Sequence, residues 1–230
     1  MAAPVVLILG AGPRVGAAVA EKFASIGYKV ALASRSGSGT KDASGFLSLR
    51  ADFARPETVP PLFDAVRAEF RAAPSVVVYN AAAATPPPDP ASVFSVPAEA
   101  FAKDLAINTT SAYVAAQHAV KGWETLPADA RKTFIYTGNI LNVALLPVPL
   151  FLTIGAGKSA SSFWLSLADT LYSAKGFRFF YADERNGDGT SMGGALNGTA
   201  HADFFAQLAT HEGNVPWHAT FVKDQGYVKF

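Results

Sequence analysis

The sequence contains no cysteine, which excludes disulfides, thiolate metal sites and a cysteine nucleophile. Charge is also scarce: 16% of the residues are charged and the net charge is +1, so no strong field attracts nucleic acid or an acidic membrane. No stretch approaches the roughly 18 uninterrupted apolar residues of a membrane span, and the apolar start lacks a basic region and the length of a signal peptide. We therefore expect a cytoplasmic protein with no nucleic-acid or membrane partner.

Hydrophobic residues make up 50% of the 230-residue chain, which is a globular composition. This length suits one large domain with a buried core and is short for two. No linker or internal repeat divides the sequence, so residues 1–230 are expected to form a single domain.

Apolar, β-branched runs alternate with segments of helical periodicity along the chain. Residues 4–9 are continuously apolar, which is typical of a strand buried on both faces of a parallel sheet. Strands are expected at residues 4–9, 28–34, 46–50, 75–79, 133–137, 177–181 and 219–222, and helices at residues 17–26, 59–70, 98–120 and 158–173. This order predicts an α/β fold, namely a Rossmann-type, doubly wound domain with a mostly parallel seven-stranded sheet.

Two segments interrupt the alternation. Residues 84–97 are rich in proline and indicate a loop. Residues 183–198 are rich in glycine and follow the sixth strand, at the edge of the sheet where such folds bind ligands. They form either a substrate loop or an ordinary flexible loop, and the sequence favours neither.

Residues 10–16, Gly-Ala-Gly-Pro-Arg-Val-Gly, follow the first buried strand and open a helix. In that context glycines allow a sharp turn and the close approach of a pyrophosphate, and the helix presents its positive end to the phosphates. The pattern predicts a dinucleotide site.

The end of the second strand distinguishes between the two nicotinamide dinucleotides. An acidic residue there would bind the adenosine ribose, whereas this chain has Ser34, Arg35 and Ser36. An arginine pairs with a 2′-phosphate, and Arg14 adds a further positive charge. We expect NADP(H) rather than NAD(H).

Two further segments are expected to contact the cofactor. Asp52 is expected to accept from the adenine amino group beside Phe53, and the small residues after Asn80 are expected to lie under the cofactor. The cofactor-binding residues predicted from these motifs are Gly10, Gly12, Arg14, Val15, Gly16, Ser34, Arg35, Ser36, Asp52, Phe53, Asn80, Ala81 and Ala82.

With these motifs, the chain resembles the short-chain dehydrogenase/reductase family between about residues 5 and 180. The glycine turn, Asp52, residues 80–82, Asn108 and Lys158 occur in the family's order and spacing. The resemblance implies a Rossmann sheet, a nicotinamide cofactor, and oxidation of alcohols or reduction of carbonyls. It implies further that Lys158 is a cofactor-binding residue, which holds the nicotinamide ribose. It also implies a homodimer or homotetramer that packs through the helices at residues 98–120 and 158–173.

The sequence departs from the family at its chemical residues. Arg14 stands where the family's turn has glycine, and Ile154 stands where it has a tyrosine four residues before the lysine. Asn139 aligns best with the family's serine, and residues 182–185 replace a proline-glycine pair. Isoleucine donates no proton, although positioned acid–base catalysis is worth about 10²–10⁴-fold. The family's usual mechanism therefore needs a substitute.

Several groups are candidates for that role. The predicted catalytic residues are Lys158, acting directly or through a water held by Asn108, and Asn139, donating to a carbonyl oxygen. Tyr136 is a weaker candidate than Tyr181. His201, His211 and His218 are each expected at a surface or interface, and their spacing suggests no metal site.

The favoured hypothesis is an NADP(H)-dependent oxidoreductase acting on a small, fairly apolar carbonyl or alcohol with a non-standard proton donor. The apolar residues 145–152 form either a wall of the substrate pocket or buried packing. The alternative is a cofactor-binding protein with a sensing or non-redox role, which the missing tyrosine favours. A purely structural role in a complex is the weakest hypothesis.

Overall fold

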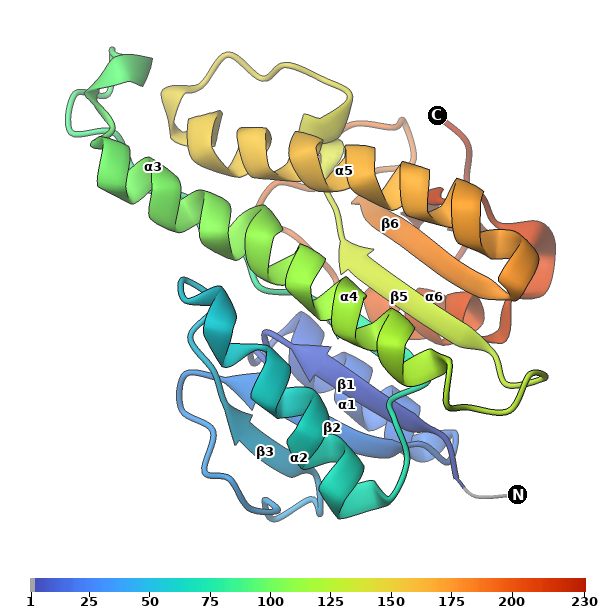
Figure 1. Ribbon diagram of the computed structural model, residues 1–230. Coiled ribbons are helices and arrows are strands. Elements are labelled where there is room, and N and C mark those ends of the chain that lie inside the picture. The colour runs from blue at the N-terminus through green and yellow to red at the C-terminus, as the bar shows by residue number, and fades with distance from the viewer. Residues whose placement is uncertain (1–2) are drawn as a thin grey trace.

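The computed structural model describes residues 3–230. One eight-stranded sheet runs through the domain in the order β3-β2-β1-β4-β5-β6-β7-β8 (Figure 1). Its strands are β1 (Val5–Leu9), β2 (Lys29–Ser34), β3 (Leu47–Arg50), β4 (Val76–Tyr79), β5 (Lys132–Thr137), β6 (Phe177–Arg185), β7 (His218–Val222) and β8 (Gly226–Tyr227). All neighbours up to β7 are parallel, which confirms the doubly wound Rossmann-type fold.

The expected number of seven strands is one too few. The eighth strand, β8, is a two-residue segment that pairs antiparallel with β7 at the edge of the sheet. Asp224 and Gly226 adopt positive φ angles of 62° and 74°, and these residues turn the chain back on itself. A strand of two residues has no periodicity from which it could be predicted.

Helices cover both faces of the sheet. They are α1 (Val15–Ser25), α2 (Pro60–Phe70), α3 (Ala98–Leu105), α4 (Ser111–Trp123), α5 (Leu152–Tyr172) and α6 (Gly198–Thr210). Alternate residues of β1 point to opposite faces. Leu7 and Leu9 join the core under α2, α4 and α5, whereas Val6 and Ile8 join the core under α1 and α6 (Figure 1). Within the described residues, no helix combines the length and the apolar character needed to cross a membrane.

The expected helix at residues 98–120 is interrupted. Residues 106–110 form a π-helical segment between α3 and α4. This segment leaves backbone carbonyls free for other partners: Tyr79 donates to the Ile107 carbonyl at 2.6 Å, and Tyr136 donates to the Asn108 carbonyl at 2.6 Å. Side chains of the sheet therefore stabilise a break that helical periodicity did not reveal.

The helix that carries Lys158 begins at Leu152, six residues earlier than expected. Gly155 and Gly157 lie before the expected start, and both are helical. A Cβ atom at position 157 would lie 2.3 Å from the Asn108 Cβ atom, so glycine is required for the close packing of α5 on the π-helical segment.

The strand β6 continues through Arg185, so the loop expected at residues 183–198 begins at Asn186 instead. The first three residues of the expected loop, Asp183, Glu184 and Arg185, are buried in the sheet. Asp183 pairs with Arg185 at 2.6 Å, and both residues align in register with β7. A buried ion pair thus replaces the solvent that charged residues ordinarily require.

Candidate active site

Two adjoining cavities lie at the carboxyl ends of the strands. Here β1 lies between β2, the next strand in the chain, and β4, to which the chain crosses over. This is the topological switch point at which open α/β sheets bind ligands. The β2 cavity, of about 780 Å³, is lined by residues that follow β1, β2, β3 and β4 and by part of α3. The β5 cavity, of about 750 Å³, is lined by residues that follow β1, β4 and β5, by α5 and by the loop after β6. Gly12, Asn80 and Ala82 line both cavities.

Most predicted cofactor-binding residues line these cavities. The β2 cavity is lined by Gly10, Gly12, Ser34, Arg35, Ser36, Asp52, Phe53, Asn80, Ala81 and Ala82. The β5 cavity is lined by Gly12, Arg14, Val15, Asn80, Ala82, Asn139 and Lys158. Gly16 and Asn108 are buried behind the cavity walls.

The glycine turn packs directly on the segment after β4. Gly10 has a φ of +98°, and a Cβ atom there would lie 2.4 Å from the Ala81 nitrogen. Asn80 fastens the contact, since its side chain donates to the Gly10 carbonyl at 2.9 Å. By contrast, a Cβ atom at Gly12 would meet no atom within 4 Å. The turn therefore leaves open space over Gly12, beside the positive end of α1, which is the arrangement that a pyrophosphate requires.

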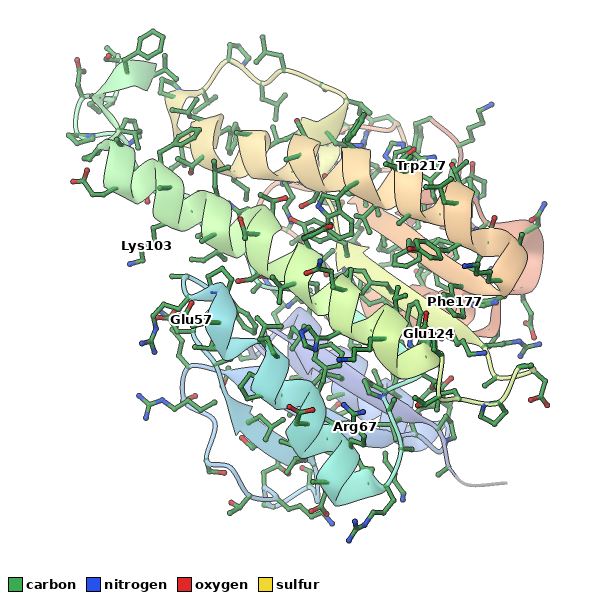
Figure 2. All side chains as sticks on the ribbon, in the orientation of Figure 1. Glu57, Arg67, Lys103, Glu124, Phe177 and Trp217 are labelled. Atoms are coloured by element: carbon green, nitrogen blue, oxygen red, sulfur yellow. The ribbon has the colours of Figure 1, made fainter. Side chains whose placement is uncertain are left out.

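The β2 cavity is rich in polar side chains and carries two cations. The hydroxyl oxygens of Ser34 and Ser36 are 3.3 Å apart, next to Arg35. Lys103 of α3 also lines this cavity, and Figure 2 shows it extending toward the loop before α2. Sequence reasoning missed Lys103, because its distance along the chain from Arg35 gives no sign that the two share a cavity.

Arg14 does not join Arg35, contrary to the expectation of neighbouring charges. It lines the β5 cavity, and its guanidinium donates to the Gly194 carbonyl at 2.7 Å. Arg14 thereby links the glycine turn to the loop after β6. Ser191, Met192, Gly193 and Leu196 of that loop also line the β5 cavity, opposite α5.

Lys158 is the buried cation of the β5 cavity, with 4% of its surface exposed. Its ammonium donates to the Thr137 carbonyl at 2.5 Å and lies 4.4 Å from the centre of the Tyr136 ring. Burial lowers the pKa of Lys158 from 10.5 to about 7, and the carboxylate of Asp183 opposes that shift. Ile154 lines the same cavity one turn earlier on α5.

Asn108 holds the cavity wall together from behind. Its side chain bonds both the nitrogen and the carbonyl of Ala83, at 2.9 and 2.7 Å. Its own carbonyl accepts from Ser161 at 2.9 Å in addition to the bond from Tyr136. Asn108 thus connects the π-helical segment with β5, with α5 and with the segment after β4.

Asn139 lies at the end of β5 with its backbone fixed. Its N–H donates to the Tyr181 hydroxyl at 3.1 Å, and that hydroxyl donates to the Asn139 carbonyl at 2.8 Å. The Asn139 side-chain oxygen accepts from the Leu141 N–H at 3.1 Å. This bond leaves the side-chain NH₂ as the group that Asn139 can offer to a ligand.

Tyr136 and Tyr181 are fully buried and stack on each other, with ring centres 5.6 Å apart. Burial raises the pKa of both phenols well above the ordinary value of 10. Both hydroxyls donate to backbone carbonyls, and neither residue lines the two cavities. The geometry gives both tyrosines a role in positioning their neighbours.

The three candidate histidines also lie outside the two cavities. His211 contacts Thr133 at the amino end of β5, and His218 contacts Asn142. His201 is fully buried rather than at a surface, and burial lowers its pKa to about 4. No group of three or more histidine, aspartate or glutamate side chains among residues 3–230 is arranged to hold a metal ion.

Glu184 is a further residue that the sequence did not suggest. It lines the β5 cavity from β6, and its carboxylate accepts from the Asn197 N–H at 2.8 Å and lies 3.3 Å from the His201 Nδ1 atom. Burial raises the pKa of this carboxyl. The family pattern at these positions is proline-glycine, so no motif marked Glu184.

Comparisons with known proteins identify the family of this chain. Residues 10–146 match the family model described as enoyl-(acyl carrier protein) reductase. The chain is 42% identical to the short chain dehydrogenase/reductase dmxR12 of Cryptosporiopsis sp. (strain 8999), over 100% of this chain and 96% of that protein. The chain belongs to the short-chain dehydrogenase/reductase family.

Solved structures show the fold of this short-chain dehydrogenase/reductase at much lower identity. A metagenomic short-chain oxidoreductase in complex with NADP has a TM-score of 0.74 at 17% identity, covering 96% of each chain. The NADH-dependent reductase A1-R′ complexed with NAD has a TM-score of 0.78 at 15% identity, covering 96% of this chain and 95% of its own. The fold therefore occurs with either nicotinamide cofactor.

Proposed function

We propose that this short-chain dehydrogenase/reductase is an NADP(H)-dependent oxidoreductase that acts on an apolar carbonyl or alcohol, with Lys158 as the proton donor. The observation that carries the proposal is a buried lysine with a pKa of about 7 in the cavity that also contains the glycine turn. A bound nicotinamide supplies or accepts the hydride. The chain's own residues must therefore bind the cofactor, orient the substrate and move one proton.

The residues present fit a dinucleotide phosphate. Open space over Gly12 and the amino end of α1 suit the pyrophosphate. Ser34, Arg35 and Ser36 suit a 2′-phosphate in the β2 cavity, with Lys103 as a second cation on its wall. These residues favour NADP(H) over NAD(H), because β2 ends without the acidic side chain that binds a free ribose.

Lys158 suits proton transfer because its pKa is close to neutral pH. During reduction the ammonium gives a proton to the developing alkoxide, and during oxidation the amine takes a proton from the alcohol. Asn139 orients the substrate by donating from its side-chain NH₂ to the carbonyl oxygen. Asn108 acts as a positioning residue, since it fixes the segment after β4 against α5. Ile154 provides an apolar surface on the same wall.

The first test is a fluorescence titration with NADPH and NADH, followed by a panel of carbonyl compounds and a pH profile. We expect tight NADPH binding, and a reductase kcat/KM that falls above about pH 7 as Lys158 loses its proton. Lys158→Met should lower kcat by about 10²–10⁴-fold. Lys175→Met, on the exposed turn after α5, is the matched control and should leave the rate unchanged. A flat pH profile between about pH 6 and 9 would reject Lys158 as the donor.

The position of Ile154 favours a second candidate function. This side chain lines the β5 cavity where the family resemblance predicts a proton-donating tyrosine. A protein that binds NADP(H) but has a sensing or non-redox role is consistent with that substitution. Tight NADPH binding without turnover of any carbonyl or alcohol in the panel would select this alternative.

A homodimer or homotetramer is proposed for the same protein. Four large apolar side chains lie exposed on the outer faces of α4 and α5, namely Tyr113, Phe163, Leu167 and Leu171. Exposed apolar patches of this kind mark interaction surfaces. The pairing of α4 and α5 with the same helices of a second copy would cover them.

A further inference from the structure

A third cavity lies beside the β5 cavity, on the other side of the chain segment that connects β5 to α5. This side cavity has a volume of about 570 Å³ and is lined by residues 141–149, by Phe151 and Leu152, and by Gly155, Ala156 and Ser159 of α5, with Val93 opposite. Its volume falls in the range of about 300–1,000 Å³ that is ordinary for small-molecule sites.

The chemistry of the side cavity is almost entirely apolar. Asn142 and Ser159 supply its polar side chains: the Asn142 NH₂ group donates to Ser162, and Ser159 donates to the Leu141 carbonyl, whereas the Asn142 side-chain oxygen is buried without a hydrogen-bond partner. The sequence has no charged residue between Lys132 and Lys158. Such a lining offers a bound molecule no counter-ion and few polar side chains, so the occupant that it fits is a hydrocarbon group.

Solvent-exposed apolar residues surround this cavity. Leu145 is 90% exposed and Val143 is 63% exposed, and both belong to the lining. Soluble proteins seldom gather such residues on one loop unless the loop contacts an apolar partner. Burial of hydrocarbon against the loop would remove both the ligand's surface and these side chains from water.

The side cavity adjoins the site of the proposed reaction. Leu141, Leu146 and Phe151 line both cavities, and α5 presents Ile154 and Lys158 to one and Ala156 and Ser159 to the other. The β5 cavity must also hold the nicotinamide half of the proposed cofactor, which leaves space there for the reacting end of the substrate. The remainder of a larger substrate would then extend past Leu141, Leu146 and Phe151, which separate the two cavities.

We propose that the substrate carries a long or ring-shaped hydrocarbon arm, which occupies the side cavity while the carbonyl carbon lies beside Lys158. The proposal rests on the proposed function for the location of the carbonyl. Such a substrate is larger than the small one expected from the sequence, and it consists of a compact reacting group and a bulky apolar arm.

The test fills the side cavity without touching the reacting end. Ala156→Phe adds a ring to the lining on α5, and Ala160→Phe makes the same change one turn later, at an exposed residue outside the cavity. Two measurements are made on wild type and both variants with NADPH: kcat/KM for a series of straight-chain aldehydes from propanal to decanal, and binding of the fluorescent naphthyl ketone prodan.

For wild type, kcat/KM should rise by about fourfold for each methylene that enters the cavity. Ala156→Phe should abolish this rise, keep the propanal rate within about twofold, and weaken prodan binding by about tenfold or more. Ala160→Phe should behave as wild type. A wild-type rate that does not change with chain length, or Ala156→Phe binding prodan as wild type does, would overturn the proposal.

Failure of the proposed function would give a different result. If NADPH binds and no aldehyde is reduced, the redox activity is rejected, and prodan binding still decides whether the side cavity takes a hydrocarbon arm. If decanal is reduced no faster than propanal, the oxidoreductase stands and the hydrocarbon arm is rejected.

Discussion

Gly157 and Gly155 offer a matched test of the packing between α5 and the π-helical segment. A Cβ atom at Gly157 would lie 2.3 Å from the Asn108 Cβ atom, whereas the nearest atoms to one at Gly155 belong to Leu141 and lie 3.9 Å away. Both glycines are helical, so alanine adds about 1 kcal/mol of helix propensity at each. Only Gly157→Ala must also force the two segments apart, which costs about 1–3 kcal/mol.

The helix-propensity gain cancels when the two variants are compared. Gly155→Ala should raise the free energy of unfolding by up to about 1 kcal/mol, and Gly157→Ala should lie about 1–3 kcal/mol below it. For a chain of this size each kcal/mol moves Tm by about 2–4 °C, so the two midpoints should differ by several degrees.

The assay is thermal and urea unfolding at one fixed protein concentration, because self-association would otherwise shift the midpoint. NADPH affinity provides a second measurement, since Gly157 adjoins Lys158. If Gly157→Ala raises the free energy of unfolding as much as Gly155→Ala does, the close approach to Asn108 does not require glycine, and the expected difference between the two variants is refuted.

Three other predictions concern cofactor, loop and assembly. Arg35→Ala should weaken NADPH binding by about 10–100-fold and leave NADH binding nearly unchanged, because only the 2′-phosphate needs the cation; equal losses for both cofactors, measured by titration, would contradict this. Arg14→Leu removes the hydrogen bond to the Gly194 carbonyl, so limited proteolysis should cut the segment around residues 186–196 faster than in wild type. An unchanged rate of cleavage would show that this hydrogen bond does not restrain the loop. Leu167→Asp places a charge on the exposed apolar face of α5 and should shift the sedimentation coefficient toward that of the monomer. Ile26→Asp, at the exposed end of α1, is the control. A sedimentation profile of Leu167→Asp like that of wild type would place the subunit contact elsewhere.

Long periodic segments and the glycine turn could be predicted from the sequence, because their signals are local. Strand β1, the turn at residues 10–16 and α1 follow from hydrophobic runs and glycine spacing alone. The residues that line the β2 cavity could also be located, since the carboxyl ends of parallel strands meet at one edge of the sheet.

Features that depend on distant partners could not be predicted. The extension of β6 through Arg185 depends on the pairing of Asp183 with Arg185 and on their alignment with β7. The break before α4 depends on hydroxyl groups from β4 and β5, and Lys103 reaches the β2 cavity only through the path of α3. In each case the deciding contact joins residues that are far apart in the chain.

The surroundings of Lys158 have a consequence for the energetics of the proposed reaction. Its ammonium lies between the Thr137 carbonyl and the Tyr136 ring, and Tyr136 is itself fixed by the Asn108 carbonyl. These neighbours belong to the sheet and to the π-helical segment rather than to a loop. The polar environment of the lysine is thus in place before a ligand arrives, and little of the binding free energy has to be spent on ordering it. Because its surroundings are fixed, Lys158 is expected to respond to a bound ligand by a change in its protonation state rather than by a change in its position.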